Sequence, residues 1–446
     1  MTRVYAAFLG CKVSQADSEA ALAQLASAGM EPVPSADRAD VCLLMTCCVT
    51  AEAERKSRRL ARRLARNGRR VLVAGCAARL RAAQFTDPGV EVVDAHEWEG
   101  LADIIASGAR GGRRGEPMVA TGGGERPATT GATAAEEPAT AASVSRARLR
   151  FTLKVQDGCA GRCSFCVVRL VRGRPRSTPV TQAVAAAREA LAAGCGEVVL
   201  SGIDLGAYRD AGGAGTAPGG VADLADLVTA LVDLPGLARL RLSSLEPECL
   251  DDRLLEALGH PRVARHLHLP LQSADDGVLA AMRRRSTAAD YLATVERVRS
   301  RLGDVMLSTD VIVGFPTEDE AAFARTLATL ESGLFGRVHV FAYSSRPGTE
   351  AAERRPLPAA VVRARASAAG AAAREARRRA ARGVLGRRSE VLIEDRRDGL
   401  WRGYSSQYVR YYLSGPAQAG QLVDVVAEGL HEDGVRGHRQ VDGRAR

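Results

Sequence analysis

Short apolar runs alternate with polar, helix-forming stretches through the first third of the chain. The apolar runs are bounded by turn residues, as buried strands are, and they cover Val4–Leu9, Val41–Met45 and Val71–Ala74. Helices are expected over about 17–27, with Asp17 or Ser18 as the N-cap, and over about 51–66. Gly10–Gln15 reads as a turn before the first helix. A parallel sheet with helices on both faces buries such a pattern.

The same alternation resumes near residue 148, where six strand–helix units follow one another. Their strands are expected at 151–156, 197–200, 238–242, 266–273 and 339–343, and within 306–316, where a strand enters a loop. Six units make an incomplete (β/α) barrel, whose missing quarter would leave a side opening for a large substrate. A long, alanine-rich and arginine-rich helix is expected within 350–388.

The remaining stretches have different textures. Residues 111–147 are almost entirely Gly, Ala, Thr, Pro, Glu and Arg, which cannot build a core and indicate a flexible linker. After residue 386, four short strands rich in aromatic residues, at 389–394, 400–406, 408–413 and 422–426, predict a small antiparallel β-barrel. The expected organisation is an α/β chain with an N-terminal parallel-sheet domain (1–110), the linker (111–147), a partial (β/α)6 barrel (148–386) and the C-terminal β-barrel (387–446).

Composition limits the class of protein. The chain has 446 residues, of which 46% are hydrophobic, enough for ordinary cores in two or three domains. It contains no apolar run of about 18 residues, the length of a membrane span, and its first residues lack the core of a signal peptide. Ten cysteines in such a chain are better explained by metal-binding thiols in a reducing cytoplasm than by disulfides.

The charge balance points towards a polyanion without proving one. Lys and Arg number 62 against 52 Asp and Glu, giving a net charge of +10. Such an excess favours RNA as a partner. The alternative is compositional bias, because Ala and Arg are abundant along the whole chain.

One cysteine-rich loop stands at the start of the central barrel. Cys159, Cys163 and Cys166 are separated by three and then two residues, directly after a predicted strand. Thiolates bind iron–sulfur clusters or zinc, but structural zinc needs four ligands, and no fourth Cys or His follows before Cys195. Three cysteines on a four-iron cluster leave one iron open, which favours a cluster over zinc and over a structural role.

A second set of three cysteines lies in the N-terminal domain. Cys11, Cys47 and Cys76 each follow a predicted strand, so three loops bring three thiols to one edge of the sheet. This arrangement suits another cluster with one open iron. The alternative is that each is a small buried hydrophobe.

These motifs resemble a known family. The CxxxCxxC loop with Phe165 is similar to the radical S-adenosylmethionine (SAM) superfamily, and its flanks, Asp157-Gly158 and Arg172–Ser177, resemble the methylthiotransferase branch. The segments around the three N-terminal cysteines resemble the amino-terminal domain of that branch, where three cysteines hold an auxiliary cluster. Two positions depart from the family pattern, since Met45 and Ser14 stand where it usually has Asn. Cys48 is an additional thiol that could replace Cys47 as a ligand; Cys47 is the preferred one.

The resemblance implies two [4Fe–4S] clusters with different tasks. The cluster on Cys159, Cys163 and Cys166 would bind SAM and cleave it, after electron donation by a protein such as flavodoxin or ferredoxin, to a radical that removes hydrogen from an unactivated C–H bond. A sulfur held by the auxiliary cluster, on Cys11, Cys47 and Cys76, would receive a methyl group from another SAM.

The family pattern also assigns residues around SAM. Ser201 and Gly202 resemble the segment that binds its amino group, Ser244 and Glu246 are placed for its ribose and carboxylate, and Val313 lies in a strand that packs on adenine. Gly202 could instead serve a turn, and Glu246 could cap a helix. On another strand, His266 and His268 share one face, where lining a core or a substrate is a better interpretation than a metal pair.

The C-terminal barrel resembles a TRAM domain, an OB-like RNA-binding module. Its aromatic and basic residues could stack on bases and bind phosphates, with Arg402, Tyr404, Tyr408 and Arg410 as candidates, or could form a small core with exposed arginines. The arginines of 350–388, which include Arg363, Arg365, Arg374, Arg377, Arg378, Arg379 and Arg382, allow RNA contact or a solvated face.

Within the family, the chain is most similar to the MtaB type, through Gly10–Val13, Ile203–Tyr208 and Gly403–Tyr408. That branch adds a methylthio group to C2 of N6-threonylcarbamoyladenosine at position 37, in the anticodon stem-loop of tRNA. The alternatives are the isopentenyladenosine branch and the ribosomal-protein branch, whose first motif usually has Pro where this chain has Lys12. A tRNA-binding iron–sulfur sensor without turnover is an alternative of another class. A cytoplasmic monomer is expected.

Overall fold

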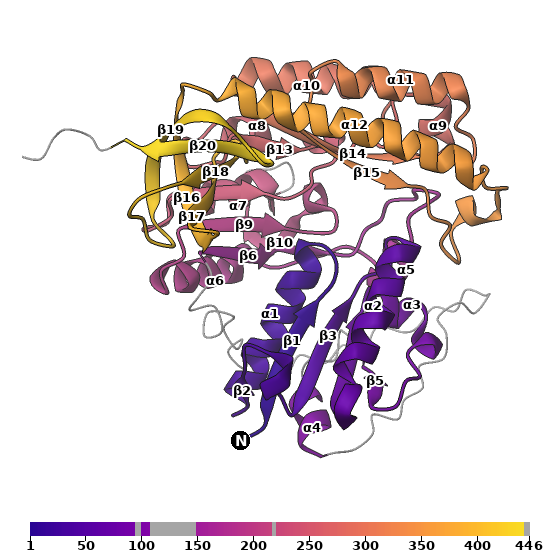
Figure 1. The fold of residues 1–446 in the computed structure, drawn as a ribbon, viewed down its shortest axis with the longest axis vertical. Coiled ribbons are helices and arrows are strands. Elements are labelled where there is room, and N and C mark those ends of the chain that lie inside the picture. Colours follow the sequence, from indigo (N-terminus) through magenta and orange to yellow (C-terminus); the bar gives the residue numbers. More distant parts are fainter. Residues whose placement is uncertain (94–99, 108–148, 216–219, 441–446) are drawn as a thin grey trace, which may run out of the picture. The chain divides into compact units, whose positions relative to one another are not determined.

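The computed structural model describes residues 1–93, 100–107, 149–215 and 220–440 (Figure 1). The chain divides into two compact units: Met1–Arg146 with Val167–Gly173, and Ala147–Cys166 with Arg174–Arg446. The predicted linker, 111–147, lies outside the described residues. No helix in the part of the chain that the structure describes is long and apolar enough to cross a membrane.

The first unit is built on a parallel sheet, as predicted, and the sheet has five strands where three were expected. Its strands follow the order β2-β1-β3-β4-β5. They are β1 (Arg3–Phe8), β2 (Glu31–Pro32), β3 (Val41–Thr46), β4 (Arg70–Gly75) and β5 (Val90–Val92). The central strands β3 and β4 are almost wholly buried because helices cover both faces of the sheet.

The helices of this unit divide between the two faces. The core on one face includes residues of α1 (Lys12–Ser27) and α4 (Leu101–Ala106); the core on the other includes residues of α2 (Ala51–Leu64), α3 (Cys76–Leu80) and α5 (Val168–Arg172). The expected turn at Gly10–Gln15 was wrong in part, since α1 begins at Lys12. Gly10, at φ +138°, makes the turn, and Cys11 is already the extended N-cap.

The second unit holds an open barrel of six parallel strands. Two sheets, β6-β9-β12 and β13-β14-β15, are joined through a bridge between Ser244 and His268. The strands are β6 (Arg150–Lys154), β9 (Glu197–Ser201), β12 (Arg239–Leu242), β13 (His266–His268), β14 (Met306–Val313) and β15 (Arg337–Ala342). This arrangement confirms the partial (β/α)6 barrel.

Helices connect these strands. They are α6 (Val180–Ala192), α7 (Leu224–Val232), α8 (Asp252–Leu258), α9 (Asp276–Ala281), α10 (Ala288–Leu302), α11 (Glu320–Glu331) and α12 (Ala359–Gly383). Two short antiparallel pairs accompany them, formed by β7 (Gln156–Asp157) with β8 (Arg176–Ser177) and by β10 (Arg209–Ala214) with β11 (Val221–Asp223). Polar N-caps begin several of the helices; Thr287, for example, forms a capping box with Asp290 on α10.

The C-terminal segment of this unit is a closed barrel of five strands (Figure 1). It contains β16 (Arg388–Arg397), β17 (Leu400–Ser405), β18 (Arg410–Leu413), β19 (Leu422–His431) and β20 (Gly434–Arg439). Four of these strands were expected. The fifth, β20, pairs in parallel with β18 and closes the barrel, so the barrel is not purely antiparallel.

Candidate functional site

Three thiols meet at one edge of the N-terminal sheet. Cys11, Cys47 and Cys76 follow β1, β3 and β4, which are neighbours in the sheet. Burial raises the pKa of Cys47 to about 11, and the negative charges of nearby Cys76 and Cys11 add to the rise. The charges of Cys76 and Cys11 both act on Cys47, so three adjacent loops place their thiols in one neighbourhood of the sheet edge.

The backbone before Cys76 is tightly constrained. Gly75 adopts φ +90°, and a Cβ there would lie 2.8 Å from the backbone oxygen of Thr46. The Thr46 hydroxyl donates to the Ala74 carbonyl at 2.6 Å and accepts from the Ala78 amide at 3.1 Å. Thr46, next to Cys47, thus fixes the strand end and the helix that carry Cys76.

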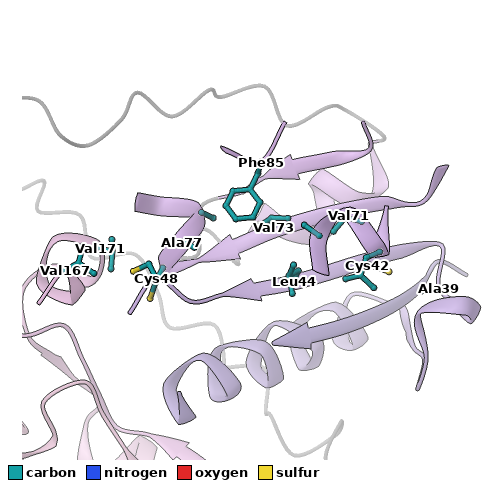
Figure 2. Close-up of a cluster of buried hydrophobic side chains, with 14 residues drawn as sticks. Ala39, Cys42, Leu44, Cys48, Val71, Val73, Ala77, Phe85, Val167 and Val171 are labelled. Atoms are coloured by element: carbon teal, nitrogen blue, oxygen red, sulfur yellow. The ribbon is translucent and has the colours of Figure 1, made fainter. Parts of the chain in front are cut away.

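Two hydrogen-bond partners act on Cys76. The pKa of this thiol is lowered to about 6, first by a hydrogen bond with Cys48, and the Arg172 charge overcomes part of the opposing effect of burial. The Arg172 Nε–H lies 3.3 Å from the Cys76 Sγ. Cys48 is fully buried in the core cluster that also contains Val167 and Val171 of the α5 segment (Figure 2).

Ser14 and Met45, the two positions that depart from the family pattern, have different surroundings. Ser14 lies in the first turn of α1, and its hydroxyl is 3.8 Å from the Cys11 Sγ, so a polar group still contacts the sulfur. Met45 is fully buried in the core on the α1 face of the sheet. Where the family usually has the amide of Asn, this chain therefore has an apolar side chain that packs in the core instead of forming a hydrogen bond.

The second cysteine loop is anchored by its backbone while its thiols remain partly exposed. Cys159, Cys163 and Cys166 are all half-buried. Ser164 holds the loop, because its amide donates to the Met282 carbonyl at 3.0 Å and its hydroxyl to the Ala281 carbonyl at 2.7 Å. A rigid loop with three accessible thiols fits a cluster that keeps one iron open to a ligand.

Sequence reasoning gave no role to two polar residues beside this loop. Asp204 Oδ2 lies 3.5 Å from the Cys159 Sγ, and the Asp204 amide donates to Gln156 Oε1 at 2.8 Å. Gln156 also donates to the Asp157 and Gly158 carbonyls. Burial raises the pKa of Cys159 to about 12, with Asp204 contributing, so iron binding there would release a proton.

The SAM candidates lie around the ends of β9, β12 and β14. Ser201 is the last residue of β9 and is buried, while Gly202 follows it with no room for a side chain, since a Cβ would lie 2.9 Å from the Gln156 Cβ. Ser244 forms an isolated parallel β-bridge with His268 through the backbone. Which of these residues touch SAM stays a prediction.

Two further observations refine this set. Glu246 forms an ion pair with Arg284, whose pKa is raised because the charges of Glu246 and Cys163 outweigh burial. Val313 is fully buried, whereas Ile312, on the opposite face of β14, is partly exposed.

A histidine cluster lines the partial barrel. His268, Asp310 and His339 bring possible ligand atoms within 4.8 Å of one another. Both ring nitrogens of His268 already have partners: Nδ1 is 2.9 Å from the Ser308 hydroxyl and Nε2 is 3.2 Å from Asp310. The rings of His268 and His339 meet edge-on with centroids 5.7 Å apart, and the expected lining role of this strand face stays a prediction.

The predicted RNA-contact residues make several contacts inside their own unit. The rings of Tyr404 and Tyr408 stack at 4.8 Å, and Tyr408 also lies 4.9 Å from the ring of His266. The guanidinium of Arg410 contacts the Tyr404 hydroxyl, and Arg402 pairs with Asp395. All four residues remain partly exposed, and their contact with RNA stays a prediction.

Comparison with known proteins identifies the family of the chain. Residues 153–330 match the radical SAM superfamily, and residues 3–94 match an uncharacterized protein family, UPF0004. The threonylcarbamoyladenosine tRNA methylthiotransferase MtaB of Thermotoga maritima is 32% identical over 434 residues, covering 96% of this chain and 94% of that protein. The chain belongs to the radical SAM tRNA methylthiotransferase family.

The other relatives and structures agree with this membership at a coarser level. A tRNA-2-methylthio-N(6)-dimethylallyladenosine synthase of Cereibacter sphaeroides is 34% identical over 428 residues, covering 93% of each chain. The two relatives therefore carry names for different tRNA substrates. Among solved structures, the radical SAM methyltransferase TsrM of Kitasatospora setae matches the fold with a TM-score of 0.55 at 15% identity, over 79% of this chain and 74% of that one.

Proposed function

We propose that this enzyme inserts a methylthio group at C2 of N6-threonylcarbamoyladenosine at position 37 of tRNA. The observation that carries the proposal is the presence of two separate three-thiol sites in a member of this family. A sensor needs one redox group, whereas methylthio insertion needs one site for SAM cleavage and another for sulfur. The MtaB relative, 32% identical over 96% of this chain, supports this substrate, and the Cereibacter synthase, 34% identical over 93%, makes its own substrate the second candidate.

The residues of each site have distinct tasks in this reaction. Cys159, Cys163 and Cys166 would hold the cluster that binds SAM, and Cys11, Cys47 and Cys76 would hold the auxiliary cluster. When bound, the two clusters supply the electron that cleaves SAM to a hydrogen-abstracting radical and the sulfur that receives the methyl group. The chain itself contributes the anchored loop at Ser164, the constrained turn at Gly75 and the polar groups around each set of thiols.

Exposed arginines support tRNA as the partner. On α2 and directly after it, Arg59, Arg63 and Arg66 are exposed and have no ion-pair partner among the residues that the structure describes. On α12, Arg363, Arg374 and Arg378 are exposed as well. Unneutralised guanidinium groups are the side chains that bind phosphate oxygens of nucleic acids. By contrast, Arg365 is buried against Glu318 at 2.9 Å, so it belongs to the core and not to an RNA surface.

Nucleoside mass spectrometry on tRNA from a strain lacking the gene tests the proposal. Loss of the methylthio form of threonylcarbamoyladenosine, restored by the gene, is the expected result. If the methylthio-isopentenyl form disappears instead, the chain acts on the substrate named for the Cereibacter relative. If neither changes, the reaction proposed here is wrong.

An assay on the purified protein separates an enzyme from a sensor. Anaerobic protein reduced with dithionite is expected to cleave SAM to 5′-deoxyadenosine. A protein that holds iron and tRNA but does not cleave SAM would instead be a tRNA-binding iron–sulfur sensor.

A further inference from the structure

A buried arginine contacts one of the N-terminal thiols. The Arg172 side chain is 5% exposed, and its Nε–H points at the Cys76 Sγ from 3.3 Å. Its Nη1 forms an ion pair of 2.7 Å with Asp17 Oδ2, and Asp17 is also buried, at 4% exposed. A charged guanidinium is rarely buried unless paired, so this position is specifically built.

The surrounding packing fixes the direction of the guanidinium. Arg172 ends α5, whose Val171 packs in the same core cluster as Cys48 and Cys76. Arg79, from α3, donates to the Val171 carbonyl at 2.5 Å and ties the two helices together. Asp17 lies on α1, so its ion pair directs the Arg172 Nε–H at the sulfur, whereas Arg79 contacts the backbone of α5.

A donor at this distance changes the chemistry of a ligand sulfur. A thiolate bound to iron still has lone pairs that accept hydrogen bonds, and each bond withdraws negative charge from the sulfur. Hydrogen bonds to the sulfurs, together with nearby charge and solvent exposure, set the reduction potential of an iron–sulfur cluster. A guanidinium beside the sulfur therefore stabilises the reduced, more negative cluster.

We propose that Arg172 is a positioning residue of the auxiliary cluster: it orients the Cys76 sulfur and raises the reduction potential of the cluster. This inference rests on the proposed function, because it needs the auxiliary cluster on Cys11, Cys47 and Cys76. Arg172 lies six residues after Cys166 in the sequence. The same segment of chain thus supplies a ligand to one cluster and a hydrogen bond to a ligand of the other.

The test uses the full chain with Cys159, Cys163 and Cys166 replaced by Ala, so that only the auxiliary cluster remains. Iron content and a redox titration followed by electron paramagnetic resonance are measured after anaerobic reconstitution with iron and sulfide. Arg172→Gln alone would leave the buried Asp17 carboxylate without the Arg172 charge, so the decisive variant is Asp17→Asn with Arg172→Gln. Arg79→Gln is the matched control, since Arg79 contacts the same helix through the Val171 carbonyl and not through the sulfur.

The expected result is a midpoint potential shifted to lower values in the double variant and unchanged in Arg79→Gln. Loss of iron from a folded double variant, with iron retained in Arg79→Gln, would equally support the positioning role. Full iron content with an unchanged potential and an unchanged spectrum would overturn it. If the chain with native Arg172 binds no iron once the three central cysteines are removed, the auxiliary cluster is absent and the proposed function itself fails.

Discussion

Glu197 and Arg241 form a fully buried ion pair between neighbouring barrel strands, with the Arg241 Nε donating to Glu197 Oε1 at 2.8 Å. Glu197 also forms ion pairs with Arg150 at 3.1 Å and with Arg239 at 3.2 Å. Arg239 also donates a hydrogen bond to the Tyr404 carbonyl, and Arg241 donates one to the Ser405 carbonyl. Both carbonyls lie in the C-terminal barrel. Glu197 therefore contacts three guanidinium groups where the two barrels of the second unit meet, and Glu394 and Glu390 supply further negative charge to Arg150 and Arg239.

Glu197→Gln is expected to destabilise this unit strongly. It would remove the buried countercharge of Arg241, while Arg150 and Arg239 would keep only their pairs with Glu394 at 2.7 Å and Glu390 at 3.0 Å. Losing one partner of a buried pair costs about 3–5 kcal/mol. Chemical denaturation of the variant and the native chain measures the difference, with Asp40→Asn, which breaks the exposed pair with Arg3, as the control that should change little.

The same group predicts how stability depends on pH. Burial alone would raise the pKa of Glu197, but the charges of Arg241 and Arg150 outweigh it and lower the pKa from 4.5 to about 2. Because the folded pKa is depressed, this contribution is fully present above 4.5 and is lost as the pH falls towards 2. The stability difference between native chain and Glu197→Gln should therefore shrink between those values; a constant difference would show that Glu197 is not ionised at neutral pH.

Separate tasks for the two thiol sites predict separate losses. Cys163→Ala should abolish SAM cleavage, because the central loop then lacks one of its three thiols. Cys76→Ala should leave SAM cleavage in place and stop sulfur insertion. Production of 5′-deoxyadenosine and of methylthio nucleoside is measured in parallel, and loss of both activities in folded Cys76→Ala would contradict the division.

Adjacent Cys47 and Cys48 make the choice of ligand testable. Cys48 is fully buried in the core and forms a hydrogen bond with Cys76, whereas Cys47 interacts with both Cys76 and Cys11. Cys47→Ala should therefore lose auxiliary iron, and Cys48→Ala should retain it. Iron and sulfide are counted in chains that lack the three central cysteines; the reverse pattern would identify Cys48 as the ligand.

Local pattern predicted the elements better than the contacts between them. Cys11, Cys47 and Cys76 were found because each follows an apolar run, and strand ends are readable from such runs. The pair of Arg172 with Asp17 joins positions 155 residues apart, so no local spacing signals it. The strand β20 was missed for a related reason: its alternation, Gly434–Arg439, has few apolar side chains and gains its place by pairing with β18 and β19.

Tyr408 is expected to stabilise the fold in addition to any contact with RNA. Its backbone adopts φ +64°, its ring stacks on Tyr404 and lies tilted against His266, and the Arg241 guanidinium lies 4.6 Å from the ring centre. Tyr408→Ala should lower the free energy of unfolding by about 3 kcal/mol, as large aromatic truncations do. Denaturation and tRNA binding of Tyr408→Ala are compared with those of Arg402→Gln. If Arg402→Gln weakens tRNA binding without lowering stability, Arg402 belongs to the RNA contact.

The exposed arginines on α2 and directly after it predict how the affinity for tRNA depends on salt concentration. Arg59, Arg63 and Arg66 are exposed and unpaired among the described residues, whereas Arg55 and Arg62 are exposed but paired with Glu52 and Asp87. Removing one arginine that binds a phosphate should reduce the slope of log affinity against log salt by about one, so replacing the three unpaired arginines by Gln should flatten it by about two to three. Replacing the two paired arginines is the control and should change the slope less, because their charges are already neutralised. Equal slopes for native chain and triple variant would exclude α2 from the tRNA-binding surface.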